Sequence, residues 1–414
     1  MIKFDRFQLD NGLKVLVHKD KNSPIVAINI IYDVGAKDEQ PDKTGFAHLF
    51  EHLMFGGSVN IPDYDTPLQK VGGENNAFTN NDVTNYYLTL PKENIETGFW
   101  LESDRMLSLA FSEKSLEVQR NVVIEEFKQR YLNQPYGDVY LLLRPLAYKV
   151  HPYQWATIGK EISHIENATM QDVKDFFFKH YAPNNAVLVV AGNVETEEIK
   201  KLAEKWFGPI PKRNIAVRNL PAEPKQTEAR KLTVYRDVPN SMIYKAYHMD
   251  SRTGDKYHAT DLISDILSNG ESSRLYRKLV QEKQLFIELD AYIMGSFDPG
   301  LFIIAGKLNT GVSMEEAENA INNELELLKK EGVAKDELQK VKNKVEATLV
   351  YSEINLLNRA MTLAQYEIFD KAESVNNEVD KYLSVDCKQI KDVANEVFAD
   401  TNCSTLYYLT EKEK

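Results

Sequence analysis

Two histidines and one glutamate stand at helical spacing in the segment His48-x-x-Glu51-His52. The pattern from Thr44 to Phe55 is that of a helix, and Gly56-Gly57 ends it. On a helix, positions i, i+3 and i+4 share one face, so the three polar side chains point the same way. Two neutral imidazoles one turn apart can bind one Zn²⁺, and a carboxylate between them can take a proton from water. The segment therefore predicts a zinc site that supports metal-assisted hydrolysis.

A coincidental amphipathic helix with two histidines is the alternative, but the intervening glutamate makes the metal site the better interpretation. The order His-x-x-Glu-His is the inverted form of the commoner His-Glu-x-x-His motif. A catalytic zinc site needs a third protein ligand. Both candidates, Glu125 and Glu126, lie on the predicted helix 114–131. Glu126 lies beside the apolar face of that helix, but periodicity alone leaves the two glutamates nearly equal.

The elements around these residues mix strands and helices in an irregular order. The first half has predicted strands at 7–9, 13–18, 25–34, 84–90 and 186–191 and helices at 44–55, 95–107, 114–131, 169–181 and 195–206. After a proline-rich stretch the order starts again, with strands at 232–236, 242–248 and 404–409 and helices at 261–267, 274–283, 314–330, 335–347 and 388–398. This pattern predicts an α+β protein of two homologous domains, each a mixed or antiparallel sheet packed with helices. The predicted boundaries are 1–212 for the metal-binding domain, 213–230 for a linker and 231–414 for a second domain without the metal site.

Composition excludes several classes of protein. The 50 Lys and Arg against 62 Asp and Glu give a net charge of −12, which disfavours nucleic acid and anionic membranes as partners. With only two cysteines there is no disulfide framework and no cysteine-based metal cluster. No apolar run is long enough for a transmembrane helix, and the first residues lack the apolar region of a signal peptide. The cytoplasm is the expected location, with the periplasm or secretion as the alternative if a signal was removed.

The sequence resembles the pitrilysin/insulinase metallopeptidases, above all the small subunits related to the mitochondrial processing peptidase and its bacterial relatives. The resemblance covers nearly the whole chain. It rests on His48-x-x-Glu51-His52, Gln119-Arg120-x-Val122-Val123-x-x-Glu126, Gly72-Gly73-x-x-Asn76-Ala77-x-Thr79, Pro135-Tyr136-Gly137, His151-Pro152-Tyr153 and Pro183-x-Asn185-Ala186.

The resemblance implies a role for each matching residue. His48 and His52 match the zinc histidines, Glu126 matches the third ligand, and Glu51 matches the general base. Glu125 is then a solvated helix residue or a group that supports the ligands. Asn76, Ala77 and Phe78 match the edge strand that pairs with an extended peptide substrate through main-chain bonds. A plain turn before a strand is an equally good interpretation of Gly72-Gly73.

Two positions depart from the family pattern. Some long-chain relatives carry an extra active-site Glu where this chain has Gln119. Complete members also carry an Arg and a Tyr in the second half that stabilise the oxyanion, and the aligned residues here are Val280 and Ile287. Neither apolar side chain can donate to an oxyanion.

The intact metal motif together with the missing Arg and Tyr favours a zinc endopeptidase subunit with one Zn²⁺ per chain. Its two domains would form half of a clamshell, and a homologous partner would supply the Arg and Tyr. The enclosed chamber would admit peptides or unfolded segments rather than folded proteins. A homodimeric peptidase with other oxyanion donors is one alternative, and a non-catalytic structural subunit of the same fold is another.

Overall fold

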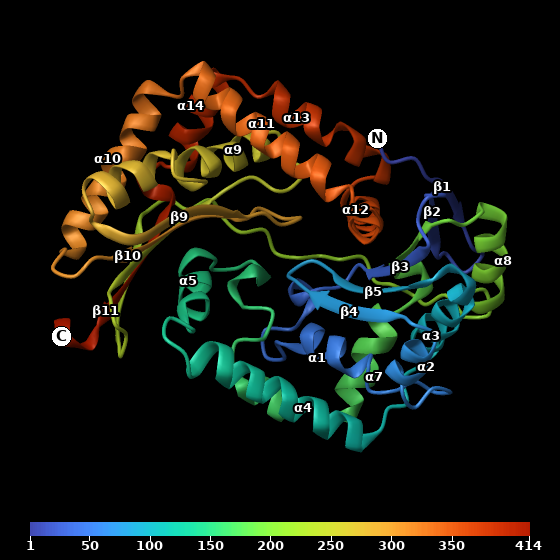
Figure 1. The fold of residues 1–414 in the computed structure, drawn as a ribbon. Helices are drawn as coiled ribbons and strands as arrows, with labels where there is room; N and C mark the ends of the chain where they lie inside the picture. Colours follow the sequence, from blue (N-terminus) through green and yellow to red (C-terminus); the bar gives the residue numbers. More distant parts are fainter. The chain divides into compact units, whose positions relative to one another are not determined.

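The computed structural model describes residues 1–414 and divides into two compact units, each built on one mixed sheet (Figure 1). Neither unit is a single continuous stretch of chain. The first unit comprises Met1–Gln129, Trp155–Leu220 and Val350–Asn377, and the second comprises Arg130–Gln154, Pro221–Leu349 and Glu378–Lys414. The predicted α+β class is confirmed. The predicted boundaries 1–212, 213–230 and 231–414 stay a prediction about the duplicated halves, because each compact unit combines segments from both.

The sheet of the first unit has six strands in the order β1-β2-β6-β3-β5-β4. They are β1 (Asp5–Gln8), β2 (Lys14–Lys19), β3 (Ile25–Tyr32), β4 (Glu74–Thr79), β5 (Thr84–Pro91) and β6 (Ala186–Gly192). Only the β2–β6 pair is parallel. All seven residues of β6 are buried, as their apolar character predicts for a central strand. Strand β4 lies at the edge and pairs with β5 alone, so its other edge has no strand partner.

Helices cover this sheet. They are α1 (Phe46–Leu53), α2 (Asp65–Lys70), α3 (Ile95–Leu107), α4 (Glu113–Phe127), α6 (Ile162–Glu166), α7 (Met170–His180), α8 (Thr196–Trp206) and α12 (Leu356–Phe369). Helix α12 comes from the second half of the sequence, yet it packs on β3 and β6 (Figure 1). Arg359 of α12 is 2.6 Å from the Asp20 carboxylate, and Arg6 is 2.7 Å from Glu367. The first sheet is therefore completed by a helix that lies far away in sequence.

The second unit repeats this plan with five strands in the order β7-β11-β8-β10-β9. They are β7 (Arg230–Arg236), β8 (Met242–His248), β9 (Phe286–Met294), β10 (Leu301–Leu308) and β11 (Cys403–Thr410). Again one pair, β7–β11, is parallel and the others are antiparallel. The order and directions match those of β2-β6-β3-β5-β4, so the two units share one topology.

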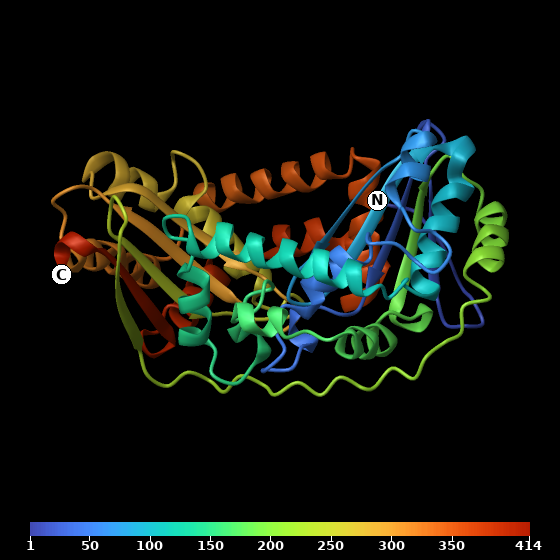
Figure 2. The same ribbon diagram turned by 90° about the horizontal axis from the view of Figure 1, so that it is seen from below.

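Helices also pack on the sheet of the second unit. The helices of this unit are α5 (Val139–Ala147), α9 (Tyr257–Ser268), α10 (Met314–Glu331), α11 (Lys335–Ser352), α13 (Glu378–Ser384) and α14 (Cys387–Val397). Helix α5 packs on β11 and β8, just as α12 packs on β6 and β3. Each half of the chain therefore contributes one helix to the sheet of the other half. Residues 211–227 contain no helix or strand and run as an extended segment (Figure 2).

No helix in the structure combines the length and the apolar character that a membrane crossing requires.

Candidate metal centre

Helix α1 carries both histidines, and its start is defined by Gly45. This residue adopts φ +88°, a left-handed conformation that glycine tolerates best, and a Cβ there would lie 2.6 Å from the carbonyl oxygen of Ile158. The preceding Thr44 hydroxyl accepts a hydrogen bond from the Lys160 amide at 2.8 Å and contacts His164 Nδ1 at 2.8 Å. These contacts fix where the chain enters the helix.

The apolar face of α1 fixes how the helix is rotated. Phe46, Leu49, Phe50 and Leu53 are buried. The ring of Phe50 stacks on Tyr181, just after α7, with 5.2 Å between centroids. Because this face is buried, His48, Glu51 and His52 turn to the opposite, half-buried side, as helical periodicity predicts.

His180 is the last residue of α7, which packs against α1. Only 7% of the surface of His180 is exposed. Its Nε2 atom has no hydrogen-bond partner in the structure. Burial lowers the pKa of His180 to about 3 from an ordinary 6.5, and the positive charge of Lys179 lowers it further. The folded protein therefore holds this imidazole neutral where the unfolded chain would protonate it.

We expect this imidazole to make the protein less stable in mild acid. Between pH 7 and pH 5 the unfolded state gains a proton that the folded state does not bind, which lowers the free energy of unfolding by about 2 kcal/mol. Urea unfolding at both pH values measures the decrease in the free energy of unfolding. In a His180→Asn variant this decrease should be smaller by about 2 kcal/mol. Equal losses in the variant and the parent protein would contradict the assignment.

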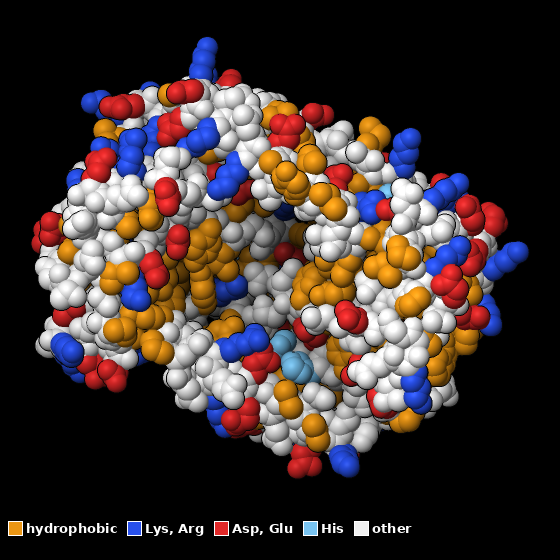
Figure 3. All heavy atoms as spheres, viewed as in Figure 1, with side chains coloured by type: hydrophobic (Ala, Val, Ile, Leu, Met, Phe, Trp, Pro, Cys, Tyr) orange, Lys and Arg blue, Asp and Glu red, His pale blue; other side chains and the backbone are white.

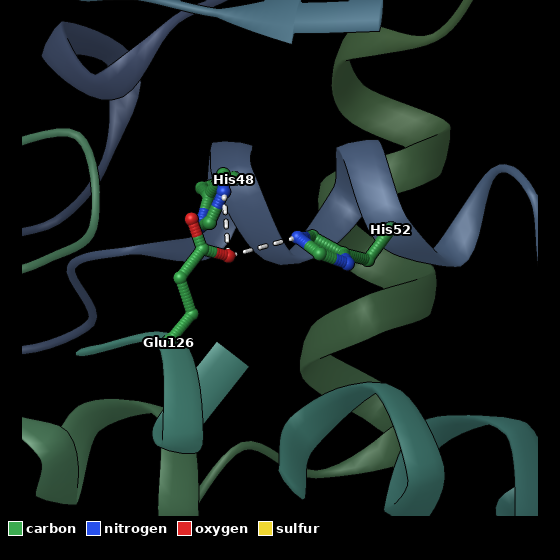
Figure 4. A group of neighbouring side chains, drawn as sticks. All are labelled: His48, His52 and Glu126. Atoms are coloured by element: carbon green, nitrogen blue, oxygen red, sulfur yellow. Dashed lines mark ion pairs between the residues drawn. The ribbon is translucent and has the colours of Figure 1, made fainter. Parts of the chain in front are cut away.

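Glu126 on α4 completes a three-residue group with His48 and His52 (Figure 4). One carboxylate oxygen of Glu126 lies 3.6 Å from Nε2 of His48 and 3.4 Å from Nε2 of His52. One ligand atom from each of the three residues lies within 4.8 Å of the other two. The residues come from helices separated in sequence but packed together, since α1 contacts α4.

The sequence pattern left Glu125 and Glu126 nearly equal, and the structure separates them. Glu125 is exposed and forms an ion pair of 2.7 Å with Lys128 on its own helix. Glu126 instead points to the two imidazoles, with Val123 and Phe127 buried beside it. The structure thus brings His48, His52 and Glu126 together and leaves Glu125 outside the group.

The donor set suits a zinc ion. Two imidazole nitrogens and one carboxylate oxygen form a set found in catalytic zinc sites, which keep a further position for water or substrate. The side chains are 13%, 24% and 18% exposed for His48, His52 and Glu126, so solvent reaches the group. Figure 3 shows histidine side chains at the surface over α1.

Glu51 lies between the two histidines in sequence and belongs to the same half-buried side of α1. Burial raises the pKa of its carboxyl group, and the negative charge of Glu126 raises it further. Thr79 and His52 oppose this rise. Thr79 belongs to the edge strand β4, which packs beside α1.

The predicted substrate-binding residues Asn76, Ala77 and Phe78 lie in the middle of β4. Asn76 is exposed, and the other two are half-buried. Their strand packs beside α1 and has one unpaired edge. An edge strand of this kind presents main-chain donors and acceptors to an added strand.

The second half of the chain has no polar side chain at the two positions where an Arg and a Tyr were expected. Val280 packs against the hydrophobic core of the second unit. Ile287 lies on the edge strand β9 with 41% of its surface exposed. The nearby Arg274 forms an ion pair of 2.7 Å with Glu337. That guanidinium is already bound within its own unit.

Comparison with known proteins places the chain in a family. Residues 14–153 match the family described as Insulinase (Peptidase family M16), and residues 167–345 match the Peptidase M16 inactive domain. The zinc protease PqqE of Helicobacter pylori is 30% identical over 413 residues, which cover 98% of this chain and 92% of that protein. The chain belongs to the M16 peptidase family.

Two further comparisons agree with this assignment. The crystal structure of a protease from Helicobacter pylori matches with a TM-score of 0.92 and 29% identity, covering 99% of this chain and 100% of that one. The beta subunit of the mitochondrial-processing peptidase of Saccharomyces cerevisiae is 29% identical over 208 residues, 50% of this chain and 44% of the subunit. The predicted resemblance to the pitrilysin/insulinase family and its small subunits is therefore confirmed.

Proposed function

We propose that this M16 protein is a zinc-dependent endopeptidase subunit that hydrolyses peptides or unfolded segments. The observation that carries the proposal is the convergence of His48, His52 and Glu126, with Glu51 beside them. The similarity to proteins named zinc proteases supports the choice of metal.

In this proposal His48, His52 and Glu126 hold one Zn²⁺ per chain. The ion, when bound, polarises the scissile carbonyl group and lowers the pKa of water. Glu51 accepts the proton of the attacking water and then donates it to the amine that leaves. Its raised pKa suits a group that must both take and return a proton near neutral pH.

The unpaired edge of β4 is the proposed binding site for the substrate. An extended peptide would pair with the main chain of Asn76, Ala77 and Phe78, adding a strand to the sheet. Because main-chain groups are common to all peptides, this binding favours extended substrates without selecting one sequence. Folded proteins lack such a free strand, which is why peptides and unfolded segments are the proposed substrates.

Val280 and Ile287 are the reason to propose a partner. Removal of one oxyanion donor costs about 10²–10³ in rate, so a chain without the Arg and Tyr should be a poor enzyme alone. We propose that a homologous subunit supplies the pair and closes a chamber with this chain, as two halves of a clamshell. Residues 167–345 match a domain described as inactive, which agrees with a supporting role for this part of the chain. A homodimer with other donors is the alternative assembly.

The same match also favours a second candidate, a non-catalytic structural subunit of this fold. It would bind partners through the same surfaces without hydrolysis. The complete set of His48, His52, Glu126 and Glu51 argues against it, since a purely structural subunit has no need of the set.

Assay of a quenched peptide, with the chain alone and mixed with a homologous chain that carries the Arg and Tyr, tests the proposal. We expect the mixture to be at least about 10²-fold faster than the lone chain and to lose its activity with a zinc chelator. High activity of the lone chain, with a single size on gel filtration, would contradict the heteromer. Absence of both zinc and hydrolysis in every mixture would favour the structural subunit.

A further inference from the structure

Glu39 has a buried carboxyl group that lies outside the proposed metal-binding residues. It is 7% exposed and follows a short 3-10 turn at Ala36–Asp38. One of its oxygens accepts a hydrogen bond from the Gly45 amide at 2.9 Å, and the other accepts one from the Ala47 amide at 2.8 Å. Both oxygens are thus used on the first turn of α1. An acidic side chain is costly to bury, so this arrangement needs a structural reason.

The reason lies in the start of α1. The first amides of a helix have no partner within the helix, and an N-cap side chain normally accepts their hydrogen bonds. Here the N-cap is Gly45, which has no side chain. Glu39 takes over that task from the loop that precedes the helix, six residues before Gly45.

The loop that carries Glu39 is itself held firmly. The amides of Ala36 and Lys37 bond to the carbonyl oxygens of Asn80 and Asn81 at 3.0 and 2.9 Å. A buried ion pair of 2.8 Å joins Lys37 to Asp82. The indole of Trp155 donates to the Ala36 carbonyl at 2.8 Å, and Arg218 pairs with Asp38 at 2.7 Å. Glu39 is therefore a rigid support rather than a mobile surface group.

We propose that Glu39 is a positioning residue for the metal centre, an inference that rests on the zinc site proposed above. Helix α1 has only eight residues, and His48 follows Ala47 directly. By fixing the first turn, Glu39 fixes the two imidazoles relative to Glu126 on α4. Outer partners that orient metal ligands typically contribute 10- to 100-fold to metal affinity.

Zinc affinity of the full-length protein, measured by competition with a fluorescent chelator, tests this proposal. We expect Glu39→Ala to raise the zinc Kd by about 10- to 100-fold. Glu39→Gln keeps one acceptor oxygen and should cause a smaller rise. The visible spectrum of the Co²⁺-loaded variants, which reports ligand geometry, should shift in the same order.

Asp386→Ala is the matched control. Asp386 caps α14 by accepting from the Gln389 amide at 2.7 Å, and that helix carries none of the three ligands. The control should lower the midpoint of thermal unfolding while the zinc Kd stays within twofold of the parent value. If Glu39→Ala does not fold, the Kd of Glu39→Gln decides.

A Glu39 variant with a lower midpoint of thermal unfolding but the parental zinc Kd would overturn the positioning role. It would leave the proposed function intact. A parent protein that binds no stoichiometric zinc would overturn the proposed function and this inference together. The two failures are therefore distinguished by the parent measurement.

Discussion

Replacement of Glu51 by Gln is expected to lower kcat for peptide hydrolysis by about 10²- to 10⁴-fold, the range that a positioned general base contributes. The amide cannot accept the proton of the attacking water, yet it has nearly the shape of the carboxylate. The proposed ligands His48, His52 and Glu126 are untouched, so the variant should still contain one zinc per chain. Activity with the quenched peptide and zinc content by mass spectrometry, measured on the same preparation, check both parts.

Glu125→Gln is the matched control for this prediction. Glu125 is exposed and forms an ion pair with Lys128, away from the two histidines. It should keep both the metal and the rate. A Glu51→Gln variant with nearly parental kcat would show that Glu51 is not the base. A variant that lost its zinc would instead place Glu51 among the groups on which binding depends.

Replacement of Glu126 by Gln is expected to raise the zinc Kd by more than about 100-fold. Loss of a residue that only orients a metal ligand usually costs about 10- to 100-fold. The carboxylate oxygen lies 3.6 and 3.4 Å from the two imidazole nitrogens, so it faces the same point as they do. A neutral amide oxygen there attracts the cation more weakly. Hydrolysis should fall with zinc occupancy, and excess zinc should restore part of it.

The neighbouring Glu125 again supplies the comparison, since Glu125→Gln removes the same charge one residue away. If Glu125→Gln released zinc and Glu126→Gln did not, the assignment of the third ligand would be reversed. If neither did, His48→Ala would show whether zinc binds at α1 at all. Together the Glu51 and Glu126 variants separate loss of chemistry from loss of metal.

The local part of the site could be predicted from sequence because helical spacing is a local property. Three residues at i, i+3 and i+4 share a face whatever surrounds the helix, and the predicted helix 44–55 is observed at Phe46–Leu53. The α+β class and the repeated order of elements also follow from local patterns. The choice between Glu125 and Glu126 required the family resemblance, because helical periodicity alone left the two neighbouring glutamates nearly equal.

Other elements escaped sequence analysis because non-local contacts stabilise them. Strands β9 and β10 and helices α5 and α12 were not among the predicted elements. The burial along β9 does not alternate regularly, so its sequence lacks a clear strand period. Helix α12 owes its place to β3 and β6, whose residues lie more than 150 positions earlier in the chain.

The sequence by itself determined the chemistry available to this protein, the helix that presents His48, Glu51 and His52, and the duplicated α+β plan. Tertiary structure alone decided that Glu39 caps their helix from the preceding loop, and that α5 and α12 each pack on the sheet formed by the other half of the chain. It also places Glu126 beside the two histidines, as the family resemblance had implied. The physical reason is that residue type and spacing determine which side chains share a helix face only over one or two helical turns. Distances between helices, and the position of the loop that caps α1, depend on packing between segments far apart in the chain.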